Sequence, residues 1–183
     1  MPTFVTHSVV GLAGGYAFAG RRMPARFWVL SIVCPFLPDF DVIAFGFGIP
    51  YQHVFGHRGF FHSLTFALLL GILVTVVFFR KEKIFSKRWW FLTVYFVLIS
   101  ATHGLLDAMT NGGLGIALFA PFDNTRYFLP WTPIEVSPIG IRRFFSAWGL
   151  RVMLSEFLWV WLPSIALMLC VKLIRQKRKS ASD

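Results

Sequence analysis

Long apolar runs separated by short polar segments dominate the chain. Five of these runs approach the length of about 20 residues that a membrane-spanning helix needs. They cover residues 4–20, 27–46, 62–79, 89–106 and 153–172. Pro35 and Pro38 fall inside the second run, so we expect that helix to be kinked or broken just before Asp39. The pattern predicts an all-α polytopic membrane bundle with about five transmembrane helices.

The stretch between the last two runs has no such regularity. Residues 108–152 contain scattered glycine, proline and aromatic residues, which predicts a helical or irregular outer loop region with short re-entrant elements. Residues 173–183 form a basic tail. The chain shows no internal repeat and no low-complexity linker, so we treat residues 1–183 as a single membrane-embedded domain.

Composition agrees with a membrane location. Hydrophobic residues make up 56% of the chain and charged residues only 14%, whereas soluble domains average about 25% charged residues. The net charge of +10 would also suit a nucleic-acid partner. The basic residues cluster where apolar runs end, however, which is the position of juxtamembrane positive charge. We therefore expect a membrane lipid and no nucleic acid as partner.

The basic clusters predict an orientation. Loops that carry an excess of Lys and Arg stay in the cytoplasm. With five spans, three clusters fall on the same side, so the N-terminus is expected outside and the C-terminus inside. The clusters are Arg21, Arg22 and Arg26; Arg80, Lys81, Lys83, Lys87 and Arg88; and Lys172, Arg175, Lys177, Arg178 and Lys179.

The same map places a set of ionisable residues at the outer ends of four spans. Such residues at membrane depth are costly and mark functional sites, and imidazoles with carboxylates suit zinc and similar divalent ions. His103 and Asp107 are four residues apart and share one helical face. His57 and His62 are too far apart for one face, so either could be the ligand. The candidate metal ligands are His7, Asp39, Asp41, His57, His62, His103 and Asp107.

Several of these residues also have ordinary structural explanations. A single histidine inside a bundle is often only a hydrogen-bonding residue, and we interpret His53 in that way. Asp123, Glu135 and Glu156 are expected to be plain loop or interface carboxylates. In the segment RYFLPW, Arg126 and Trp131 could hold a lipid headgroup or anchor the protein at the interface.

The motifs, taken in order, point to a known family. An early TH, then PDFD, HRGFFHS, HGLLDAMTNGG and RYFLPWTPIEVSP lie among apolar runs from His7 to Pro138. This arrangement resembles the YdjM-like family of bacterial membrane-bound, metal-dependent hydrolases. The resemblance implies an inner-membrane enzyme with a divalent metal and a suggested phospholipase activity. It also implies the seven metal residues named above, and LexA control within the SOS response for some members.

Residues and resemblance together favour a metal-dependent hydrolase that cleaves a lipid phosphoester at the periplasmic face. Zinc is the first expectation for the metal, with manganese or iron as alternatives. We expect Asp41 and His57 to act as acid, base or ligands, and Arg58, a fixed fork of donors, to bind the phosphate. A small metal-ion or proton-coupled transporter is the alternative. A metal-independent lipid phosphatase with a histidine nucleophile is a weaker third reading, because HGLLD lacks the accompanying motifs.

Overall fold

The computed structural model describes residues 1–19, 23–138 and 141–181, and every regular element in these ranges is a helix. The expected all-α class is therefore confirmed, while Arg21 and Arg22 of the first basic cluster lie outside the described residues. The elements are α1 (Phe4–Ala19), α2 (Ala25–Val33), η1 (Leu37–Phe47), η2 (Phe60–His62), α3 (Leu64–Phe78), α4 (Lys87–Ala108), α5 (Ile141–Phe144), α6 (Ala147–Glu156), η3 (Phe157–Trp161) and α7 (Leu162–Ser180).

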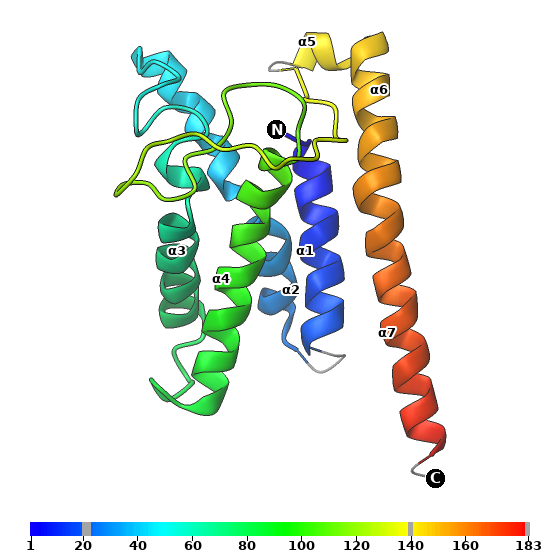
Figure 1. Cartoon of the computed structure of the whole chain (residues 1–183). Coiled ribbons are helices and arrows are strands. Elements are labelled where there is room, and N and C mark those ends of the chain that lie inside the picture. The colour runs from blue at the N-terminus through cyan, green and yellow to red at the C-terminus, as the bar shows by residue number, and fades with distance from the viewer. Residues whose placement is uncertain (20–22, 139–140, 182–183) are drawn as a thin grey trace.

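The long helices run side by side, with α4 between α3 and α1 (Figure 1). The chain from the end of α4 to α5 crosses the same end of the bundle as the N-terminus, and α7 follows the outer flank beside α1. The core between α2, α3 and α4 is formed by fully buried Phe27, Leu92 and Phe96. Gly71 allows α3 to approach α4, since a Cβ there would lie 2.4 Å from the Val97 side chain.

Two of the described helices are long and apolar enough to cross a membrane by length and composition. They are α4, with 22 residues, and the continuous helix Ala147–Ser180, with 34 residues. A third is counted if α2 and η1, bent by 46° at their junction, form one span. This junction confirms the expected break before Asp39. The helices α1 and α3 are shorter: 15 residues in α3 extend about 22 Å, less than a hydrocarbon core of about 30 Å.

The last helix is longer than the sequence indicated at both ends. It begins at Ala147, inside the expected loop region, and includes a π-helical turn at Phe157–Trp161 before it continues to Ser180. The basic tail is therefore helical as far as Ser180. Lys177, Arg178 and Lys179 occupy its last turn, where positive charge interacts favourably with the helix dipole.

The segment η1 is a 3-10 helix of 11 residues, unusually long for this type. Three residues per turn place every third side chain in line. We call Leu37, Phe40, Ile43 and Gly46 the first ridge, Pro38, Asp41, Ala44 and Phe47 the second ridge, and Asp39, Val42 and Phe45 the third ridge. Asp39 and Asp41 consequently lie on different ridges and point in different directions.

Candidate metal centre

Three segments distant in the sequence bring four polar side chains together at one end of the bundle. Asp39 comes from η1, His62 from η2, and both His103 and Asp107 from α4. His103 and Asp107 are fully buried and share a face of α4, as their spacing predicted. Gly104, between them, lets η2 lie against α4, because a Cβ there would be 2.6 Å from the His62 carbonyl oxygen.

The ligand atoms of these four residues lie within 4.8 Å of one another. His62 Nε2 is 3.3 Å from Asp107 Oδ2 and 3.7 Å from Asp39 Oδ1. His103 Nε2 is 3.5 Å from the same Asp39 oxygen. Donors arranged tetrahedrally at about 2.1 Å from one ion would be about 3.4 Å apart. These three separations are close to that value, so the four residues could hold a common ion.

The hydrogen bonding of these atoms also fits a cation. His62 Nε2, His103 Nε2, Asp39 Oδ1 and both carboxylate oxygens of Asp107 are buried and have no hydrogen-bond partner among the residues that the structure describes. Buried polar atoms are almost always paired, because an unpaired one costs free energy. Unpaired nitrogens and carboxylate oxygens that face one another would all be satisfied by one divalent ion.

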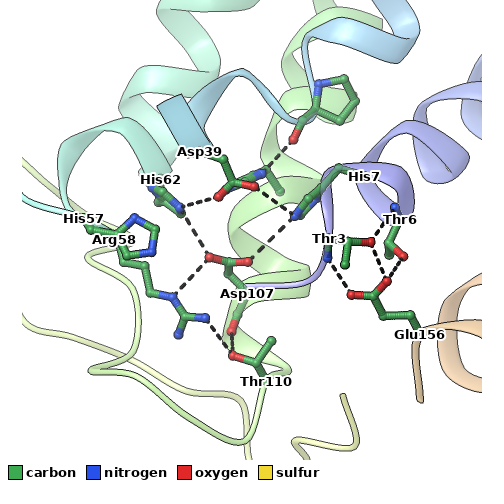
Figure 2. A network of polar contacts seen from close by, with 12 residues as sticks. Thr3, Thr6, His7, Asp39, His57, Arg58, His62, Asp107, Thr110 and Glu156 are labelled. Carbon is green, nitrogen blue, oxygen red and sulfur yellow. Dashed lines mark hydrogen bonds and ion pairs between the residues drawn. The ribbon is translucent and has the colours of Figure 1, made fainter. Parts of the chain in front are cut away.

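His7 from α1 adds a possible fifth ligand. Its Nε2 atom lies 3.9 Å from Asp39 Oδ2 and 3.8 Å from Asp107 Oδ1, and its ring stacks on that of His103 with centroids 4.1 Å apart. Figure 2 shows His7 and His62 on opposite sides of Asp107, both directed at its carboxylate. Both ring nitrogens of His7 are buried without a hydrogen-bond partner in the described chain.

Two of the histidines are oriented through their second ring nitrogen. His103 Nδ1 is 2.7 Å from the carbonyl oxygen of Pro35, at the break between α2 and η1. A carbonyl only accepts, so Nδ1 carries the proton and Nε2 presents its lone pair to the cluster. His62 Nδ1 is 3.1 Å from Asp41 Oδ2, an ion-pair distance without hydrogen-bond geometry. Metal-binding histidines in proteins are held by partners of this kind.

Asp41 lies outside the four-residue cluster, between His62 and His57. Its Oδ1 is 2.6 Å from His57 Nδ1, and its Oδ2 accepts a hydrogen bond of 3.1 Å from the backbone N–H of Arg58. Asp41, His57 and His62 form a second group that could hold an ion. His62 belongs to both groups and His57 only to the second, a distinction between the two histidines that their spacing left open.

Arg58 is directed into the protein and not towards an open space. Its side chain is buried, its Nε atom is 3.3 Å from Asp107 Oδ2, and it donates to Gly112 O and Thr110 Oγ1 at 2.8 and 2.9 Å. Its positive φ of 61° is uncommon for a side chain of this size. The sequence predicted a phosphate-binding role, whereas the structure gives Arg58 a carboxylate of the cluster as its ionic partner.

Gly56 and Gly59 explain how the HRGFFHS loop reaches this conformation. A Cβ on Gly56 would lie 2.2 Å from the Pro50 carbonyl oxygen, and one on Gly59 2.2 Å from that of Val54. Only glycine permits these approaches. The tight loop presents His57 and His62 from one short segment.

Arg126 and Trp131, expected to bind substrate, have mainly structural contacts. Arg126 donates to the carbonyl oxygens of Tyr51 and His57, both at 2.9 Å, and its guanidinium lies over the Tyr51 ring. Burial raises the pKa of that tyrosine, so it stays neutral. Trp131 is 55% exposed and packs edge-on against Trp159. Arg126 thus fixes the HRGFFHS loop, whereas the contacts of Trp131 fit either a lipid-binding or an anchoring role.

Glu156 is not the plain interface carboxylate that we expected. It is fully buried and accepts from Thr3 N at 2.5 Å and from the hydroxyls of Thr3 and Thr6 at 2.6 Å. Figure 2 shows this group beside His7, and Trp161 Nε1 donates to Thr6 Oγ1 at 2.7 Å. The network joins the long last helix to α1. A carboxylate inside an apolar run was the signal that could have revealed it.

Fold and site together define a class, that of all-helical membrane proteins with a buried histidine–aspartate cluster at one end of the bundle. The chain belongs to the YdjM inner membrane protein family, whose model matches residues 1–179. It is 40% identical over 171 residues to inner membrane protein YbcI of Escherichia coli (strain K12). The aligned region covers 92% of this chain and 95% of YbcI. No solved structure matches the chain. Membership confirms the resemblance and supports an inner-membrane location.

Proposed function

We propose that the chain is a membrane-bound, metal-dependent hydrolase that cleaves a phosphoester of a lipid or lipid-linked substrate. The observation that carries this proposal is the set of buried, mutually facing nitrogen and oxygen atoms that lack hydrogen-bond partners among the described residues. Membership of an inner-membrane family makes lipids the substrates closest to hand.

The residues that would hold the ion are Asp39, His62, His103 and Asp107, with His7 adjacent. Mixed imidazole and carboxylate ligands suit zinc first, and also manganese or iron. When bound, such an ion acidifies a water molecule and polarises a phosphoryl oxygen. Arg58, at 3.3 Å from Asp107, fixes that carboxylate and balances its charge.

His57 and Asp41 would move protons. Asp41 accepts from His57 Nδ1 at 2.6 Å, which fixes the ring and leaves Nε2 as the proton-accepting atom. In hydrolysis, the oxygen of water bonds to phosphorus while the bond from phosphorus to the leaving oxygen breaks. His57 accepts a proton from the attacking water and then donates one to the leaving oxygen.

The proposal includes five spans with the cluster at the periplasmic face. The cluster lies near the N-terminus, whereas the turn between α3 and α4 and the C-terminus lie at the opposite end of the bundle (Figure 1). That opposite end carries the second and third basic clusters, which supports a cytoplasmic position for it. The short helices α1 and α3 would span by local thinning of the bilayer.

A lipid panel tests the proposed reaction. The purified chain is incubated with phospholipids and lipid-linked phosphates, with and without a chelator, and the products are identified by mass spectrometry. We expect one class of phosphoester to be cleaved, with activity lost on chelation and restored by metal. His103→Ala should lose both metal and activity, whereas His53→Ala, outside the cluster, should keep both. Full activity in a metal-free preparation would contradict the proposal.

A further inference from the structure

An apolar groove of about 510 Å³ lies between η1 and the HRGFFHS loop. Its volume is within the range of roughly 300–1,000 Å³ that is usual for small-molecule sites. Aliphatic and aromatic side chains form almost the whole lining, and Asp41 is the only ionisable residue in it. The groove is therefore suited to a hydrocarbon and not to a polar ligand.

The 3-10 geometry of η1 gives the groove its straight wall. The first and second ridges both line it, whereas no member of the third ridge, which directs Asp39 to the metal cluster, does so. Side chains that repeat every three residues form lines parallel to the helix axis. Phe55, Phe61 and Phe66 close the other side. An extended chain fits between such walls.

The groove and the candidate metal centre adjoin each other at Asp41, which belongs to the wall of both. This residue lines the groove, and its two oxygens contact nitrogens of His57, His62 and Arg58. The carboxylate charge is therefore engaged on the side of the centre, and the groove meets the remainder of the residue. A molecule with a hydrocarbon chain in the groove would have its polar end beside His57.

The rim of the groove is open and apolar. Phe40, Ile43 and Phe47 are 56%, 57% and 80% exposed. Contiguous exposed apolar surface of this kind marks a site for an apolar partner, and in an inner-membrane protein the bilayer supplies one. A lipid chain could enter sideways from the bilayer without passing through water.

We propose that this groove holds the hydrocarbon chain of the substrate, with the scissile phosphoester held at the histidine–aspartate centre. The inference rests on the proposed function and deepens it, because it names the substrate class as a long-chain lipid. It also predicts that the length of the lipid's hydrocarbon chain, which contacts η1, contributes to substrate specificity.

Filling the groove tests this inference. Ala44→Trp adds an indole on the second ridge, inside the groove. Leu169→Trp on α7 is the control, since Leu169 is 54% exposed and does not line the groove. Each full-length variant is reconstituted with phosphatidylglycerol that carries a photoactivatable diazirine near its chain end, irradiated and mapped by peptide mass spectrometry.

We expect labelling of residues 37–66 in the unmodified protein, a decrease of about tenfold in Ala44→Trp, and no decrease in Leu169→Trp. Ala44→Leu, a smaller change, replaces Ala44→Trp if the latter loses its metal, and should give a partial decrease. Labelling of residues 37–66 that neither Ala44 variant reduces would overturn the inference.

Hydrolysis of long- and short-chain phosphatidylglycerol separates the two proposals. If the protein is labelled as expected but cleaves no phosphoester of the lipid panel, the result supports the groove and refutes the proposed reaction. If the protein cleaves the long- and short-chain lipids equally and Ala44→Trp has no effect, the result refutes the groove and leaves the proposed reaction unaffected. Preferential cleavage of the long-chain lipid, lost in Ala44→Trp alone, supports both.

Discussion

Replacement of Asp41 by asparagine tests whether Asp41 orients the candidate ligand His62 or binds metal itself. Asp41 contacts three nitrogens, with His57 Nδ1 at 2.6 Å and both His62 Nδ1 and Arg58 N at 3.1 Å. An amide keeps the shape but removes the charge and replaces one acceptor oxygen with a donor. If Asp41 only orients His62, the four-residue cluster keeps every ligand and the ion still binds.

The expected loss of metal affinity is 10- to 100-fold, or about 1.4–2.7 kcal/mol, because partners that orient metal-binding histidines contribute this much. The number of ions per chain should not change. His62→Ala, which removes a ligand of the four-residue cluster, should bind far less metal than Asp41→Asn. Asp123→Asn, at a carboxylate outside the cluster that accepts from Thr125 N and the Tyr127 hydroxyl, should match the unmodified protein.

Two measurements on the detergent-solubilised chain distinguish these outcomes. Elemental analysis gives the number of ions per chain, and competition with a chromophoric chelator gives the affinity. If Asp41→Asn and His57→Ala each lose one whole ion, Asp41 is a ligand in a second metal site formed by Asp41, His57 and His62. That result would refute its assignment as an orienting residue only.

Three further outcomes follow from the packing and the charge pattern. Glu156→Ala leaves one buried N–H and two hydroxyls without their acceptor, so the thermal midpoint should fall by several degrees, with about 1–3 kcal/mol lost per unpaired group. Gly104→Ala should displace His62 and weaken metal binding by at least about tenfold, whereas Gly46→Ala, in open space, should not, as measured by the same chelator competition. A cysteine at Gln52 should react with a membrane-impermeant reagent on intact cells and one at Lys83 should not; the reverse would invert the proposed topology.

Much of the site could be predicted from sequence because a membrane leaves ionisable residues few places to lie. His103 and Asp107 stand in an apolar run at a spacing that puts them on one helical face, and the structure has them so. The basic clusters placed the other candidates at the same end of the chain's spans. Pro35 and Pro38 predicted the helix break after which Asp39 points towards the cluster.

The sequence could not predict the directions of side chains that depend on loop closure. Arg58 is four residues from His62, and nothing local distinguishes a guanidinium that faces a substrate from one that faces Asp107. Its direction follows from the contacts with Thr110 and Gly112, more than 50 residues away. Glu156 was missed for a related reason, because its partners are at the other end of the chain.

The change from α to 3-10 geometry after Pro35 links the break in the helix to the chemistry of the site. In a continuous α-helix the N–H of Asp39 would donate to the carbonyl oxygen of Pro35. In the structure it donates to Phe36 O at 3.1 Å, so the Pro35 oxygen is free to accept from His103 Nδ1. The break therefore supplies the group that fixes the tautomer of a candidate ligand.

The same geometry lets one histidine contact both aspartates of η1. Side chains two positions apart in an α-helix differ by about 200° in direction, which would put Asp39 and Asp41 on nearly opposite faces. In a 3-10 helix they differ by about 240°, so their directions are only about 120° apart. His62 fits between them, with Nε2 3.7 Å from Asp39 and Nδ1 3.1 Å from Asp41. In a regular α-helix Asp41 would point away from His62 when Asp39 points towards it. The 3-10 geometry of η1 therefore allows His62 to contact both aspartates.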